Sequence, residues 1–144
     1  ARSAAALERA RRLGADSVVR LTEDDDVDSL ARRLGEVPVD LVIDPVSGIP
    51  AAAALRALRP GGRLVNLGSA AGDECPVSSA VLRGKSLHIH GYTNNELDPG
   101  RRREALLTVV RHAMTGALTV DYERVPLRDA GDAWTRPGRI VLVP

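Results

Sequence analysis

Aromatic residues and cysteines are scarce in this sequence. Of its 144 residues only 2% are aromatic and none is phenylalanine, so a core must be built from leucine, valine, isoleucine and alanine. The one cysteine, Cys75, excludes an internal disulfide framework and fits a reducing compartment. We therefore predict a cytoplasmic protein.

An excess of charge of one sign is lacking too. Lys and Arg total 20 and Asp and Glu total 19, so electrostatics give no reason to expect a nucleic acid or a membrane surface as a partner. No apolar run approaches the roughly 20 residues of a membrane span. We predict no nucleic acid and no membrane among the partners. The length is sufficient for one core and one domain, and no repeat or linker divides the chain.

The most informative stretch that is present is RPGGRLVNLGSAAG, residues 59–72. Its Pro-Gly-Gly, residues 60–62, predicts a helix end, because proline cannot continue a helix and glycine adopts the left-handed backbone of a cap. The apolar run 63–67 predicts a strand, and the small residues 68–72 follow it. Small residues at the carboxyl end of a strand let a ligand approach the backbone, although a plain tight loop explains them equally well.

Strands and helices are predicted to alternate along the chain. Near-continuous apolar runs such as 39–43 are typical of parallel strands covered on both faces. The pattern predicts an α/β fold with a doubly wound parallel sheet, and it places the loops after Ile43, Leu67 and His90 at one edge. The predicted helices are 3–13, 27–34, 51–58, 76–82, 99–114 and 129–134, and the predicted strands or extended segments are 17–20, 39–43, 63–67, 86–91, 120–125 and 140–143.

Three polar features could be taken for reactive or metal-binding groups. The acidic run 23–26 is better explained as a solvated loop that favours the start of the next helix. His88 and His90 lie two residues apart on a predicted strand and share one face, but without a third ligand a structural role is preferred, and no metal site is predicted. Asp44, at a strand end, is interpreted as a structural carboxylate rather than a catalytic base.

Five segments, taken in order, carry a resemblance to a known family: LGAD at 13–16, VDLVIDPVSG at 39–48, LRPGGRLVNLGSAAG at 58–72, LRGKSLHIHGYT at 82–93, and the closing VPL, AW and GRIVLVP. Together they resemble the medium-chain dehydrogenase/reductase superfamily, in its zinc-independent, quinone oxidoreductase-like branch. The resemblance implies that residues 1–144 form a single, partial NAD(P)-binding Rossmann-like domain.

Parts of the family pattern are missing. No G-x-G-x-x-G occurs in the sequence, and the first strand and helix that carry this fingerprint would precede residue 1, as would the catalytic domain. Without that first strand, the strands around residues 18 and 41 lose their common neighbour. We expect an incomplete sheet in a fragment of a larger enzyme, or in a degenerate relative of the family.

The resemblance also implies a cofactor site. Arg2 and Ser3 occupy the position where an acidic residue would select NAD and an arginine suits the 2′-phosphate of NADP, so NADPH is the expected cofactor; a solvated arginine at a frayed end is the alternative. Three loops would supply the other contacts: Pro45, Val46 and Ser47 for the adenosine half, Leu67, Gly68 and Ser69 for the nicotinamide ribose, and Gly91, Tyr92 and Thr93 for the carboxamide.

Three functions stay open at this point. The first is the cofactor-binding part of a reductase that moves hydride from NADPH to a small-molecule substrate, an activated carbonyl or alkene such as a quinone or enone. The second is the same part of a zinc-dependent alcohol dehydrogenase, and the third is a non-catalytic nucleotide-binding or dimerisation module. The catalytic residues are unknown, and we expect this chain alone to be inactive. The family pairs its edge strand across a two-fold axis, so we predict a homodimer through the strand from Leu87 to Gly91.

Overall fold

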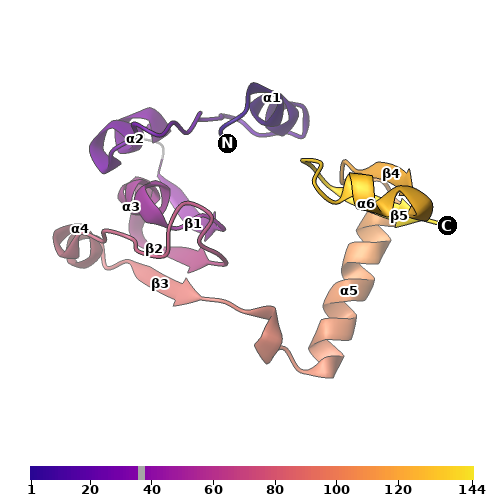
Figure 1. Ribbon diagram of the computed structural model, residues 1–144. Helices are drawn as coiled ribbons and strands as arrows, with labels where there is room; N and C mark the ends of the chain where they lie inside the picture. Colours follow the sequence, from indigo (N-terminus) through magenta and orange to yellow (C-terminus); the bar gives the residue numbers. More distant parts are fainter. Residues whose placement is uncertain (36–37) are drawn as a thin grey trace. The chain divides into compact units, whose positions relative to one another are not determined.

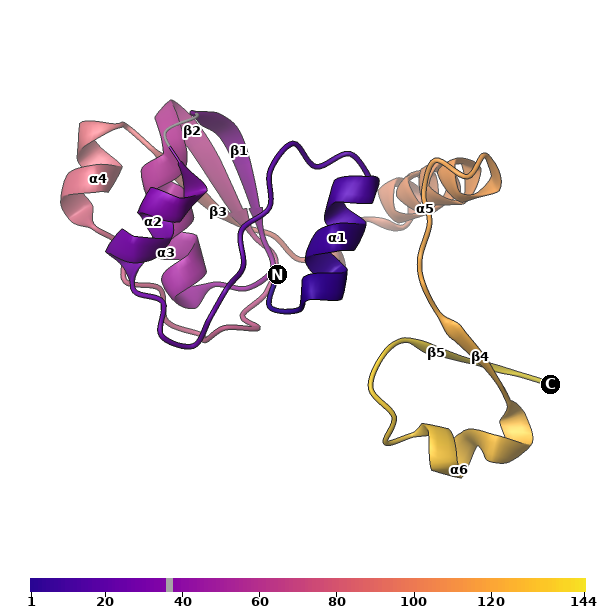
Figure 2. The ribbon, with the colours of Figure 1, turned by 90° about the horizontal axis from the view of Figure 1, so that it is seen from above.

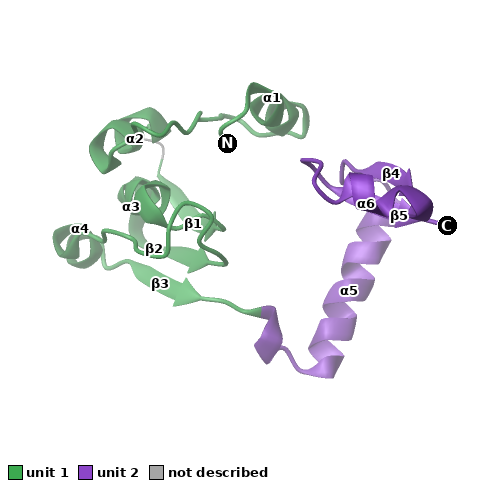
Figure 3. Ribbon diagram, in the orientation of Figure 1, with its two compact units in different colours: residues 1–93 green, residues 94–144 purple. Residues whose placement is uncertain are grey.

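The computed structural model describes residues 1–35 and 38–144, which divide into two compact units (Figure 3). Unit 1 is Ala1–Thr93 and unit 2 is Asn94–Pro144. Unit 1 contains α1 (Ala4–Arg12), α2 (Val27–Leu34), β1 (Val39–Asp44), α3 (Gly48–Ala57), β2 (Leu58–Asn66), α4 (Ser79–Gly84) and β3 (His88–Gly91). Unit 2 contains η1 (Asn94–Glu96), α5 (Pro99–Met114), β4 (Glu123–Pro126), η2 (Leu127–Asp129), α6 (Ala130–Ala133) and β5 (Ile140–Val143).

The strands of unit 1 form a parallel sheet in the order β1-β2-β3 (Figures 1 and 2). Asp44, Asn66 and Gly91 are register partners across it, so all three strands end together. The loops that follow them therefore leave from one edge, as predicted. The α/β class, with an incomplete parallel sheet, is confirmed.

One face of this sheet carries the core of unit 1. Helix α3 packs on β1 and β2, and α2 packs on α3 (Figures 1 and 2). Five residues of α3 are buried. Four of these five are alanine or glycine, which lets the helix lie close to its neighbours. The core cluster consists of Ala51, Leu55, Leu58, Leu64 and Leu87.

Within unit 1, the described residues leave the other face of β1 uncovered, so burial of this strand on both faces stays a prediction. Successive side chains of a strand point to opposite faces, and Val42 packs toward the core while its neighbours Leu41 and Ile43 are 45% and 55% exposed. An apolar run indicates that both faces of a strand can be buried, but whether they are buried depends on which helices pack against them.

The predicted helix end at residues 60–62 is wrong. Helix α3 stops at Ala57, and β2 already begins at Leu58. The register between β1 and β2 shifts between the pairs Val39–Leu58 and Leu41–Arg63, so the Pro-Gly-Gly forms a bulge in β2. Gly61 has a φ of +74° in that bulge, so the left-handed glycine serves the strand rather than a helix cap.

Lys85 fixes the junction between α3 and this bulge. Its Nζ donates to the carbonyl oxygens of Arg56 and Leu58 at 2.5 and 2.8 Å, and its own carbonyl accepts from Gly61 N at 2.7 Å. A cation is favourable at the carboxyl end of a helix, where carbonyl groups lack helical partners.

The strand predicted over 17–20 is not formed. Within the segment, Val19 O accepts from the Ala1 amino group at 3.1 Å, and directly after it Leu21 N donates to Ala1 O at 2.9 Å. Two bonds to one residue do not make a ladder. Helix α4 also begins later than predicted, after the N-cap Ser78.

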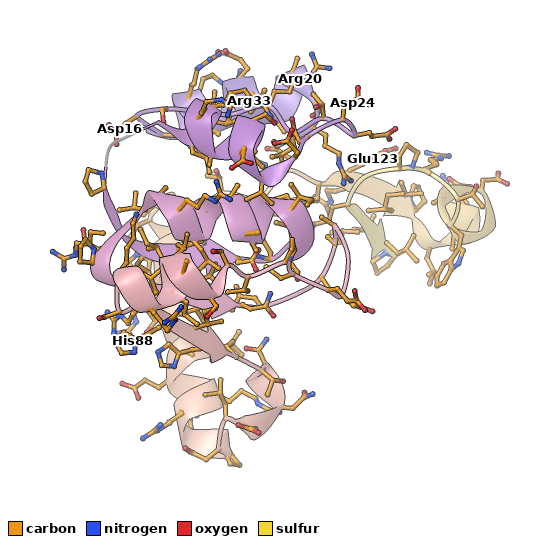
Figure 4. The ribbon with its side chains drawn as sticks, turned by 90° about the vertical axis from the view of Figure 1, so that its left-hand side faces the viewer. Asp16, Arg20, Asp24, Arg33, His88 and Glu123 are labelled. Carbon is orange, nitrogen blue, oxygen red and sulfur yellow. The ribbon has the colours of Figure 1, made fainter. Side chains whose placement is uncertain are left out.

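The acidic run starts α2, as predicted. Asp26 is the N-cap: its Oδ1 accepts from Ser29 N at 2.7 Å, and Ser29 Oγ accepts from Asp26 N at 3.3 Å. Asp25 accepts from the backbone and hydroxyl of Thr22 and pairs with Arg33, which also donates to Arg20 O at 2.8 Å (Figure 4). The backbone hydrogen bonds from Thr22 and Ser29 are the main cause that lowers the pKa values of Asp25 and Asp26.

Unit 2 contains its predicted helices and strands, although β4 begins at Glu123 and not at residue 120, and it buries little. Asp98 caps α5 by accepting from Arg101 N at 3.0 Å, and β4 pairs in parallel with β5. The apolar residues of α5 stay exposed, with Leu106 at 62% and Met114 at 82%. Among the described helices of the chain, none combines the length and hydropathy needed to cross a bilayer.

Candidate functional site

A buried carboxylate organises the carboxyl edge of the sheet in unit 1. Asp44 is 3% exposed. Its Oδ1 accepts from Val46 N at 3.0 Å and Ser47 N at 2.9 Å, and its Oδ2 accepts from Asn66 Nδ2 at 2.9 Å. Asn66 Nδ2 also donates to Gly68 O at 2.9 Å. Each of these bonds shapes a loop, so Asp44 has a structural role; that it is not a catalytic base stays a prediction.

Backbone hydrogen bonds latch the loops after β1 and β2 together. Leu67 N donates to Asp44 O, and Ala71 N donates to Val46 O, both at 2.7 Å. Glycine eases this approach: a Cβ on Gly68 would stand 3.0 Å from the carbonyl oxygen of Pro45, and one on Gly48 would stand 3.0 Å from that of Ala71, both tighter than most Cβ contacts. The small residues therefore have a structural reason, the close approach of two loops, besides the one predicted from the sequence.

Ser47 holds an unusual backbone at the start of α3. Its φ is +58°, it is buried, and Gly48 after it has a φ of +61°. A non-glycine residue in this region persists only where its surroundings hold it, and here the carboxylate of Asp44 accepts the Ser47 N–H. The loop thus has a fixed shape and places the amino end of α3 at the sheet edge. This end is the positive end of the helix dipole.

The third predicted group lies beside the first two. Tyr92 N donates to Asn66 O at 3.0 Å, which places the chain after β3 next to the loop after β2. Gly91, Tyr92 and Thr93 are exposed. The structure therefore brings all three predicted loop groups to one edge, and Asn66, which sequence reasoning missed, ties them. The signal for Asn66 that the sequence contained was a polar residue at the end of an apolar strand.

Arg2 flanks the same edge. It borders a cavity of ≈ 250 Å³ with Ile49 and Pro50 from the start of α3 and Ala71 from the loop after β2. Ligand pockets of whole small molecules usually measure about 300–1,000 Å³, so this cavity can hold a part of a ligand. Ser3 lies beside Arg2 and caps α1: its Oγ accepts from Ala6 N at 3.2 Å.

Two carboxylates line this cavity as well, Glu23 and Asp25. The Asp25 carboxylate is engaged by Thr22 and Arg33, whereas the Glu23 side chain is exposed. An anionic ligand group at Arg2 would meet a negative charge there, which lowers its affinity. Sequence reasoning did not predict this charge at the site, because it assigned Glu23 to a solvated loop.

The described residues supply neither a reactive thiol nor a three-ligand metal centre. Burial raises the pKa of the Cys75 thiol, and the negative charge of Asp44 raises it further, so the thiol stays protonated near neutral pH. No group of three or more His, Cys, Asp and Glu side chains that could hold a metal occurs in the part of the chain that the structure describes. The edge can position a polar ligand.

Residues 1–110 match the family model of zinc-binding dehydrogenases. AibC is a similar solved structure, with 28% identity and a TM-score of 0.72 over 99% of this chain and 40% of AibC. A mycobacterial protein complexed with NADPH has 25% identity and a TM-score of 0.75 over 99% of this chain and 47% of that protein. A quinone oxidoreductase of Pseudomonas syringae, at 21% identity and a TM-score of 0.72, shares the fold over 100% of this chain and 47% of its own. The chain thus spans less than half of each of these proteins. No curated protein sequence matches it.

Proposed function

The chain belongs to the zinc-binding dehydrogenase family, within the medium-chain dehydrogenase/reductase superfamily that its motifs resemble, and from this we propose that it is the cofactor-binding part of an NADPH-dependent oxidoreductase. The substrate we infer is an activated carbonyl or alkene, such as a quinone or enone. The activity is that of a longer parent protein, and we expect this chain alone to be inactive. Its two units would together form a single, partial NAD(P)-binding domain in a cytoplasmic enzyme.

The observation that carries this proposal is the latched edge of the sheet. Three parallel strands end in register, and the loops after β1 and β2 are fixed by Asp44 and by backbone bonds. Ligands of open α/β sheets bind beyond the carboxyl ends of their strands. The similarity to a protein solved with NADPH, at 25% identity, supports the choice of nucleotide.

Each predicted group has a task in this proposal. Arg2 would pair with the 2′-phosphate, and the hydroxyl hydrogen of Ser3 can still donate while its oxygen caps α1. Backbone groups of the loops at 45–47 and 67–69 would orient the adenosine and the nicotinamide ribose, and residues 91–93 would lie by the carboxamide. The bound NADPH supplies the hydride, so the protein's share is positioning.

Cofactor preference in the parent enzyme tests the proposal. A guanidinium–phosphate contact contributes about 1.5–3 kcal/mol, so NADPH should be preferred about ten- to a hundredfold. Arg2→Ala should remove that preference in the Michaelis constants, while Arg12→Ala, an exposed arginine paired with Glu8 in α1, should keep it. Equal constants for NADPH and NADH in the wild type would contradict the proposal.

A zinc-dependent alcohol dehydrogenase is the second candidate, because the matching family model is described by zinc binding. The described residues do not fit a catalytic zinc centre of three or more ligands, so residues elsewhere in the parent would have to hold it. Metal analysis of the purified parent, together with its activity after chelation, separates the two candidates: a stoichiometric zinc whose removal abolishes turnover favours the second.

The proposed partner is a second copy of the chain, paired through β3. This strand is the end of the described sheet, and its four residues are exposed. Unpaired strand edges recruit other strands, and a two-fold axis would pair β3 with its own copy in antiparallel fashion. Ile89→Pro removes a backbone donor and should shift the protein toward monomer in sedimentation velocity. A dimer that is unchanged by Ile89→Pro would contradict this interface.

A further inference from the structure

Two imidazoles stand on the same face of β3. The rings of His88 and His90 are stacked, with centroids 6.1 Å apart and planes 18° from parallel. Both residues are exposed, and His88 lies at the margin of unit 1 (Figure 4). Ile89 between them is the register partner of the buried Leu64, so it belongs to the opposite face.

The antiparallel dimer proposed above would double this pair. If the two-fold axis runs perpendicular to the sheet, residues opposite each other share a face, with Cβ atoms about 4.5–5.5 Å apart. An axis through Ile89 sets His88 opposite the partner's His90, and His90 opposite the partner's His88. Four imidazoles then gather on one face. With the axis at either histidine, that histidine still faces its own copy.

We propose that this dimer carries a transition-metal site built from His88 and His90 of both copies. Four neutral imidazoles suit Zn²⁺, Cu²⁺ or Ni²⁺, and they do not suit Mg²⁺ or Ca²⁺, which prefer oxygen. One chain offers two ligands, whereas a closed zinc site has four, so the site is incomplete without the second copy. The inference rests on the proposed dimer and lies apart from the cofactor edge.

The rings have to turn for a shared ion. A Zn–N bond of about 2.0–2.1 Å lies in the plane of its imidazole ring, and two rings that are stacked nearly parallel do not both direct such a bond at one ion. Both side chains are exposed, and rotation between rotamers on the surface is fast. Arg63 is the register partner of His88 on β2 and shares its face, so its positive charge opposes a bound cation. Replacing it should strengthen binding.

The test uses the whole chain, freed of metal by a chelator and then titrated with ZnCl₂ at pH 7.5. We expect one zinc per two chains by calorimetry, and a dimer dissociation constant at least tenfold lower with zinc in sedimentation equilibrium. The double variant His88→Ala/His90→Ala should lose both effects. His112→Ala, on α5, should keep them, and Arg63→Ala should bind zinc more tightly than the wild type.

The outcomes separate the site from the interface. A dimer that depends on Ile89 but binds no zinc overturns the metal site and leaves the interface. Zinc bound by single chains without dimer formation, or bound equally by the double histidine variant, overturns the four-histidine site. A wild-type protein that stays monomeric with and without zinc overturns both proposals.

Discussion

The two units contain similar elements, but they differ in what they bury. Unit 1 packs leucines and alanines from α2, α3 and β2, and Leu87 just before β3, into its interior, whereas the buried apolar side chains described for unit 2 are Val125 and Ala133. Helix caps formed in both units, at Ser3 and at Asp98. Local signals therefore determine helices and strands in both units, while stability against unfolding comes from neighbours that cover their apolar faces.

The polar groups differ in the same way. In unit 1 the buried Asp44 accepts three hydrogen bonds and shapes two loops. In unit 2 the ion pair between Arg136 and Glu123 spans 3.1 Å, and both side chains are about half exposed. Exposed pairs contribute about 0–1 kcal/mol, whereas breaking a buried network leaves groups without partners.

The largest expected effect comes from matched leucine truncations. Leu58→Ala removes a fully buried side chain and should lower the free energy of unfolding by about 3 kcal/mol. Leu106→Ala removes an exposed one and should change it by less than about 0.5 kcal/mol. Urea unfolding followed by circular dichroism measures both. Equal losses would mean that the apolar side of α5 is buried in solution, and the contrast between the units would fail.

Matched carboxylates should give the second-largest effect. In Asp44→Asn the new amide NH₂ group, a donor, must face another donor. The Asp44 side chain meets two backbone N–H donors on one side and the Asn66 amide NH₂ on the other. We expect a loss of about 2 kcal/mol. Asp98→Asn exchanges one good N-cap for another and should be nearly neutral. A neutral Asp44→Asn in the same unfolding assay would show that the latch does not depend on the carboxylate.

The sequence predicted most elements because their ends carry local signals. Ser3 before the first helix, Pro99 at the start of the longest one, and the common carboxyl ends of the parallel strands could all be read from neighbouring residues. The strand expected over 17–20 failed because a strand exists only with a partner. Val19 in this segment and Leu21 directly after it form backbone hydrogen bonds to Ala1 instead.

Two other features needed the folded chain. Gly61 is left-handed in either a helix cap or a bulge, so the sequence could not choose between them, and the register between β1 and β2 decides for the bulge. The latch at the candidate site joins Asp44 to Asn66 and Gly68, residues that adjoin only because two parallel strands end together. That the loops hold NADPH stays a prediction, as does the role of Arg2.

Two matched glycine substitutions should change the free energy of unfolding by smaller amounts and in opposite directions. A Cβ on Gly68 would press on the carbonyl oxygen of Pro45, a backbone atom that cannot move without disturbing the latch, so Gly68→Ala should cost about 1 kcal/mol. Gly131 lies in α6 with nothing within 4 Å of an added Cβ, so Gly131→Ala should stabilise by about 0.5 kcal/mol through helix propensity. If both variants are stabilised, the loops after β1 and β2 are looser than their hydrogen bonds indicate.

The smallest effect should appear in acid, at the periphery of unit 1. Backbone hydrogen bonds chiefly from Thr22 and Ser29 lower the pKa values of Asp25 and Asp26 from the ordinary value of about 3.9. A carboxylate with a lowered pKa in the folded state contributes stability that is fully present above the unfolded pKa and is lost as pH falls through the folded one. Unfolding free energies should therefore be flat above about pH 5 and should decline below about pH 4.

Asp26→Asn keeps a good N-cap but removes one titrating group. The decline of its unfolding free energy in acid should therefore be shallower, and the amide NMR signal of Ser29 should be insensitive to pH. An equally steep decline in Asp26→Asn would assign the acid sensitivity to carboxylates elsewhere, and the capped start of α2 would then behave like the exposed polar surface of unit 2.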